Sequence, residues 1–214
     1  MIGAIVSSIP TFLPTIATYM PVIGKMATNI MRALATLDVN KVLKIADVVI
    51  NVSEMFNLVS SGTSVEELGL KAMNGEKSRS DFESSGAYVK YLEKEVSVAS
   101  EMNASMSKED KIVATAVGTA VLMTGIDEVH GVVIGLDFYK AVTEKALPLK
   151  EIKAIIEAFK VSDVSLEDFS KFTEGTLEAK TSHTVSQLLR TVFTKMDDLL
   201  SNDDISERII DLKN

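Results

Sequence analysis

The residue types that could carry out acid–base chemistry are few. The chain has two histidines, His130 and His183, and no cysteine, so disulfides and thiolate chemistry are excluded. Asp127 precedes His130 by three residues, and on a helix this carboxylate and imidazole would share one face, as a general base with an orienting partner. The competing interpretation is a helix N-terminus at which Asp127 and Glu128 favour the helix dipole and the imidazole is incidental. We favour the competing interpretation and predict no enzyme, with His130 as the one candidate base.

The other polar clusters have simple structural explanations. Thr181 or Ser182, beside His183, is expected to cap the last long helix. An acidic group could attract a divalent cation, but it lacks the spacing and closing glutamate of a calcium loop; its members are Asp197, Asp198, Asp203 and Asp204. P-loop, GxGxxG, GxSxG and HExxH motifs are absent from the sequence. The sequence therefore predicts no catalytic residue, no cofactor and no metal site.

The first 37 residues are the most unusual stretch. Residues 1–24 contain no Asp, Glu, Lys, Arg or His, and only Lys25 and Arg32 are charged before Asp38. Such a segment must be shielded from water by its own core, by another protein chain or by lipid. The side chains expected to make this contact are Ile2, Ile5, Val6, Ile9, Phe12, Leu13, Ile16, Tyr19, Met20, Val22 and Ile23.

Length alone does not separate protein from lipid as the shield. A continuous helix of 24 residues would span about 36 Å, enough to cross a bilayer. Pro10, Pro14 and Pro21 argue against one straight helix and favour helical pieces over 2–9 and 15–20, hinged at Pro10 and Pro21. Membrane helices tolerate proline, but flanking basic residues and tryptophan anchors are missing. We expect a protein shield and keep lipid as the alternative.

Charge is divided unevenly along the chain. Residues 1–75 carry five basic and five acidic side chains, so the whole net charge of −8 belongs to residues 76–214. We predict an apolar helical arm or hairpin over 1–75 and an acidic helical bundle over 76–214, one continuous domain being the alternative. A chain without a basic patch is not expected to bind nucleic acid or anionic lipid headgroups.

Capping signals and periodicity predict helices throughout. Asp38, Ser64, Ser107 and Ser165 each precede an apolar pattern as N-caps do. The charge-free run 112–126 is expected to be a buried core helix.

Spacing within the helical patterns adds two expectations. In the run 112–126, Ala114 and Gly118 would let a neighbouring helix approach closely. Residues 127–147 fit a helix better than a strand, because a lone strand at 132–134 would have no partner. The charged, serine-rich stretch 76–85 is the best linker candidate.

The predicted fold is all-α, a multi-helix bundle with an apolar, proline-interrupted N-terminal helical segment. The predicted function is a non-enzymatic assembly or interaction protein that buries this segment in an oligomer or a larger scaffold. The alternative is a membrane-active protein of the pore-forming toxin, holin-like or anchor type, which inserts residues 1–37 and uses 112–126 as a second insertion element. We expect synthesis in the cytoplasm without a cleaved signal peptide, because the start of the chain lacks a basic n-region.

Overall fold

The protein is all-helical. A computed structural model describes residues 12–99, 105–196 and 200–213, with the side chains of 12–17 and 20 outside the description. Helices account for 73% of the structure, and the described residues include no strand. The predicted all-α, multi-helix fold is confirmed.

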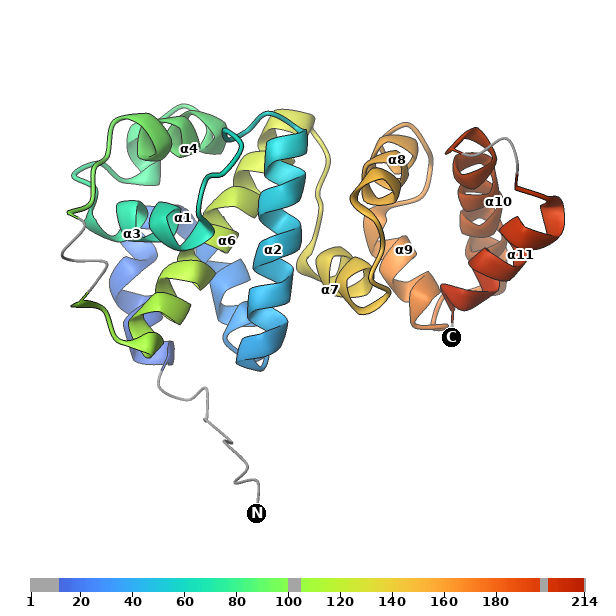
Figure 1. Ribbon diagram of the computed structural model, residues 1–214, viewed down its shortest axis with the longest axis horizontal. Coiled ribbons are helices and arrows are strands. Elements are labelled where there is room, and N and C mark those ends of the chain that lie inside the picture. Colours follow the sequence, from blue (N-terminus) through green and yellow to red (C-terminus); the bar gives the residue numbers. More distant parts are fainter. Residues whose placement is uncertain (1–11, 100–104, 197–199, 214) are drawn as a thin grey trace, which may run out of the picture. The chain divides into compact units, whose positions relative to one another are not determined.

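The described helices form two compact units, residues Met1–Gly131 and Val132–Asn214. The first unit contains α1 (Phe12–Leu34), α2 (Val39–Met55), α3 (Val65–Asn74), the short 3-10 helix η2 (Arg79–Asp81), α4 (Ser85–Lys94) and α6 (Lys108–His130). The second contains α7 (Leu136–Glu144), α8 (Leu149–Lys160), α9 (Leu166–Thr173), α10 (Ala179–Met196) and α11 (Asn202–Asp211) (Figure 1).

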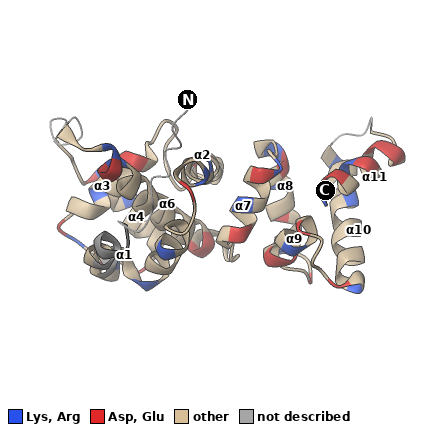
Figure 2. Cartoon of the chain, turned by 90° about the horizontal axis from the view of Figure 1, so that it is seen from below, with Lys and Arg blue, Asp and Glu red and all other residues tan. Residues whose placement is uncertain are grey.

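Helix α6 is the centre of the first unit. Every side chain from Val113 to Ile126 is buried, because α1, α2, α3 and α4 all pack against it (Figure 1). Its charged residues lie only at its two ends, so the middle of the helix is tan in Figure 2. The prediction of a buried core helix over 112–126 is confirmed. The expected hairpin takes a different form, since α1 and α2 pack chiefly against α6 rather than against each other.

Two glycines allow α3 and α6 to cross in close contact. A methyl group placed on Gly118 would lie 2.1 Å from the Val65 carbonyl oxygen, and one on Gly69 would lie 1.8 Å from the Ala114 carbonyl oxygen. The backbones of α3 and α6 are therefore in direct contact at this point. The predicted close approach at Ala114 and Gly118 is confirmed, and α3 is the neighbour that uses it.

Capping by short polar side chains follows the sequence signals. Asp38 accepts from the Lys41 backbone N–H, and the hydroxyls of Ser64 and Ser107 accept from the N–H groups three residues later. Ser165 forms a full capping box with Asp168. These four predicted helix starts are confirmed. Ser84 caps α4 in the same manner.

The hinge of α1 lies at a glycine. The helix continues through Pro21 and bends at Gly24, whose φ of 83° and ψ of 166° are non-helical. Proline keeps a helical φ and costs mainly one hydrogen bond, whereas glycine alone adopts a positive φ at little cost. The predicted hinge at Pro21 is therefore wrong by three residues. The predicted piece over 2–9 lies outside the described residues.

The division between the units falls in the 131–135 connection. Gly131 ends α6 with a left-handed φ of 61°, and α7 begins at Leu136, so residues 127–147 are helix, connection and helix. The compositional boundary after residue 75 does not coincide with this division, because α3 before it packs on α6 after it. The expected linker 76–85 instead contains η2 and the start of α4.

Candidate functional site

The predicted interaction residues are described only in part. Ile2, Ile5, Val6 and Ile9 lie outside the described residues, and Phe12, Leu13, Ile16 and Met20 lie in α1 with their side chains not described. Tyr19 and Val22 are half-buried, and Ile23 is buried.

Among the α1 side chains that the structure describes, Ile23 is the first that is buried in the core of the first unit. Ile23 is 2% exposed, and the buried face continues through Met31 and Leu34. Before Ile23, Thr18 and Pro21 are exposed and Tyr19 and Val22 are half-buried. Of the predicted interaction residues whose side chains are described, Tyr19, Val22 and Ile23, the structure buries Ile23 in the core of its own unit.

An arginine and a glutamate fix the surroundings of the α1 bend. The Arg79 side chain packs at Gly24, where a Cβ would lie 3.1 Å from its Cγ. Arg79 Nη2 donates to Glu128 Oε1 at 3.0 Å, and the Ser85 hydroxyl donates to the same oxygen at 2.8 Å. The Ser85 backbone N–H donates to the second carboxylate oxygen. Glu128 therefore caps the N-terminus of α4 from the end of α6.

The charge of Glu128 is stabilised at this position. Burial alone would raise the pKa of Glu128, but the hydrogen bonds from Ser85 and Arg79 outweigh burial and lower the pKa below its ordinary value. The interpretation of Asp127 and Glu128 as a helix N-terminus was wrong for their own helix, because α6 ends at His130. The favourable helix dipole for Glu128 comes from α4 instead.

A second carboxylate holds α4 at its other end. Glu93 Oε1 accepts from the Ser60 backbone N–H at 2.6 Å and from the Thr63 hydroxyl at 3.2 Å. Burial raises the pKa of Glu93, and the bonds from Ser60 and Thr63 outweigh burial and lower the pKa. Both carboxylates thus join α4 to distant parts of the chain.

His130 lies in a packing environment. Its ring is half-buried against the Phe56 ring, with centroids 4.0 Å apart. It is the last residue of α6, where a histidine suits the helix dipole. His183 is exposed on α10.

Ser182 does not cap α10. Its backbone N–H donates to the Glu178 carbonyl, so it already lies inside the helix, which begins at Ala179. The predicted cap at Thr181 or Ser182 is therefore wrong.

The acidic group serves helix capping where it is described. Asp204 accepts from the hydroxyl and backbone N–H of Ser201, a capping box that opens α11 and lowers the Asp204 pKa. Asp203 is exposed in the same turn, and Asp197 and Asp198 lie outside the described residues. In the described part of the chain no three His, Asp or Glu side chains gather as metal ligands would.

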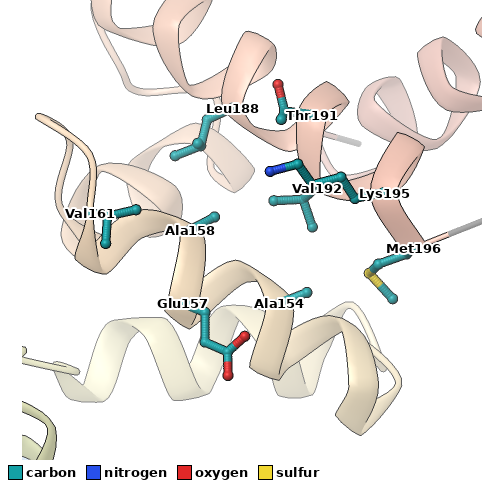
Figure 3. Close-up of a pocket in the computed structure, with 9 residues that line it drawn as sticks. All are labelled: Ala154, Glu157, Ala158, Val161, Leu188, Thr191, Val192, Lys195 and Met196. Atoms are coloured by element: carbon teal, nitrogen blue, oxygen red, sulfur yellow. The ribbon is translucent and has the colours of Figure 1, made fainter.

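The second unit carries an open groove between α8 and α10. The groove has a volume of about 380 Å³, and its lining residues are Ala154, Glu157, Ala158, Val161, Leu188, Thr191, Val192, Lys195 and Met196. Ala154 and Ala158 point from α8 toward α10, while Glu157 points away (Figure 3). The groove was not predicted from the sequence, although two alanines four residues apart on one helix face are a signal for it.

An ion pair between a buried carboxylate and a partly exposed arginine joins helices of the same unit. Glu151, which is 4% exposed, accepts from Arg208, and Arg208 also lies over the Phe193 ring at 5.1 Å. The ion pair connects α11 to α8 across 57 residues of sequence, and the ring contact connects α11 to α10. Nothing local in the sequence indicates it.

Of the described helices, α6 has the length and apolar composition needed to cross a membrane, and 78% of its most apolar window is buried within the protein.

Comparison with known proteins found no matching family model, no matching curated protein and no matching solved structure. The site must therefore be interpreted from its own chemistry.

Proposed function

We propose that this protein is a non-enzymatic helical interaction protein that self-associates through its apolar N-terminal segment. The observation that carries the proposal is that, among the described side chains of α1, Thr18, Tyr19, Pro21 and Val22 are exposed or half-buried and Ile23 is the first that is buried. An uncharged, isoleucine-rich stretch precedes them. Burying each of its large apolar side chains in a partner would contribute about 1.5–3 kcal/mol.

Light scattering of the purified full-length chain tests the proposal. We expect a mass above 23.2 kDa for the wild type and a return to that mass in an Ile5→Asp/Ile9→Asp double variant. Each carboxylate would have to be desolvated in an apolar contact, which strongly disfavours association. A monomeric wild type, or an unchanged mass in the double variant, would count decisively against self-association.

A membrane-active role is the second candidate, favoured by the encased apolar helix α6. Its buried, uncharged middle could enter lipid only if α1, α2, α3 and α4 moved away from it. Flotation with liposomes of neutral lipid at pH 7 and pH 4.5 separates the two candidates. Co-flotation and dye release would support the membrane role, and no binding at either pH would remove it.

A further inference from the structure

The groove between α8 and α10 has the form of a helix-binding site. Its floor is made by Ala154 and Ala158, whose small side chains leave room for a backbone to approach α8 closely. Val161, with 85% of its surface exposed, and the half-buried Leu188 add apolar surface at its edge. A valine so fully in water beside an alanine floor offers apolar area to a partner.

The charge of the groove selects an uncharged occupant. Its lining has one carboxylate, on Glu157, and one ammonium group, on Lys195. The Glu157 carboxylate is 3.9 Å from Lys153 Nζ, on its own helix face. A phosphate ligand needs several donors on one spot, which this lining does not supply. An apolar, uncharged segment could lie against Ala154 and Ala158 without having to desolvate any charged group of its own.

The chain contains a segment of this type. Ile2, Ile5, Val6 and Ile9 follow the i, i+3, i+4, i+7 spacing of helices that bind in apolar grooves. As a helix, residues 2–9 would present these four side chains over about 10 Å. The groove-lining residues from Ala154 on α8 to Val161, which caps the end of α8, also span seven residue steps. Pro10 favours a separate helical piece here, because proline disfavours helix in the residue before it.

We propose that residues 2–9 of a second copy of this chain dock as a helix in the α8–α10 groove. The inference rests on the proposed self-association and names the surface that receives the segment. Reciprocal exchange between two copies would close a dimer with two identical contacts.

A peptide-binding measurement tests the contact directly. The probe is a fluorescent peptide of residues 1–12, and the acceptor is the full-length Ile5→Asp/Ile9→Asp chain, whose own segment no longer competes. We expect saturable binding by anisotropy, at least tenfold weaker when Val161→Asp or Ala158→Arg is added to the acceptor.

Ile210→Asp is the matched control: Ile210 is also an exposed apolar residue at a helix end of the same unit, 57% exposed and outside the groove. Circular dichroism verifies that each acceptor is folded.

The outcomes separate the groove from the wider proposal. No peptide binding, or equal binding to the Val161→Asp, Ala158→Arg and Ile210→Asp acceptors, overturns the groove assignment. If the segment variant becomes monomeric while Val161→Asp in the otherwise wild-type chain keeps its mass, self-association stands and the groove assignment falls. Binding of the peptide to a chain that is monomeric in its wild-type form would place the segment in its own groove and overturn the second-copy assignment.

Discussion

Replacement of a single hydrogen atom by a methyl group should separate α3 from α6. In Gly118→Ala the new Cβ would lie 2.1 Å from the Val65 carbonyl oxygen, so one backbone must move. We expect the free energy of unfolding to fall by about 1–3 kcal/mol, the cost of overpacking a core. Urea titration followed by circular dichroism measures the change. Gly135→Ala is the control, because Gly135 has open space around it; equal midpoints for the two variants would contradict the crossing.

A carboxylate that is stabilised in its charged form makes stability depend on pH in a known direction. Because the Glu128 pKa is lowered on folding, its contribution is present above the ordinary carboxyl value and is lost as pH falls through the folded value. We expect Glu128→Gln to cost about 1 kcal/mol at pH 7, discounted for partial exposure, and progressively less as the pH falls below about 4.5.

Urea titrations at pH 7, 4 and 3 measure this difference for Glu128→Gln. The control is Glu76→Gln, which alters an exposed carboxylate. A deficit for Glu128→Gln that stays constant down to pH 3 would show that shape, and not charge, fixes this position.

The bend in α1 offers a test at the scale of one element. Gly24 and Gly62 have almost the same φ, 83° and 84°, but only Gly24 faces a neighbour, the Arg79 side chain. Alanine is strained at both positions, at about 1–3 kcal/mol each. We expect Gly24→Ala to lose more unfolding free energy than Gly62→Ala, because the methyl group also crowds Arg79. Chemical denaturation of both variants gives the comparison, and an equal loss would mean that the bend does not depend on Arg79.

Local signals predicted the elements and missed the contacts between them. The N-caps at Asp38, Ser64 and Ser107 were predicted correctly, because a capping side chain and its N–H partner are three residues apart. The Arg79–Glu128 pair joins residues 49 apart, so a single sequence gives no sign of it.

The same limit explains the partial success at the α3–α6 crossing. The small residues at Ala114 and Gly118 predicted that a helix would approach, but not which one. Gly69 identifies α3 as that helix only once the fold is known. Of the candidate site, the apolar segment could be predicted from the sequence and the groove could not, because Ala154 and Leu188 meet only through the packing of α8 on α10.

At the scale of the whole molecule, self-association ties stability to concentration. A folded oligomer that dissociates on unfolding gains stability by mass action, and a tenfold rise in concentration is worth about 1.4 kcal/mol of association free energy. Shared between the two chains of a dimer, this is about 0.7 kcal/mol per chain, which for 214 residues corresponds to a rise of about 1.5–3 °C in the thermal midpoint. We expect this rise for the wild type between roughly 5 and 50 µM, concentrations chosen for one tenfold step. The midpoint of Ile5→Asp/Ile9→Asp should stay constant over the same range, because a monomer unfolds independently of concentration.

Differential scanning calorimetry on both proteins measures the difference, with Ile210→Asp as a control that should follow the wild type. A wild-type midpoint that does not change with concentration would exclude an oligomer whose stability depends on the N-terminal segment.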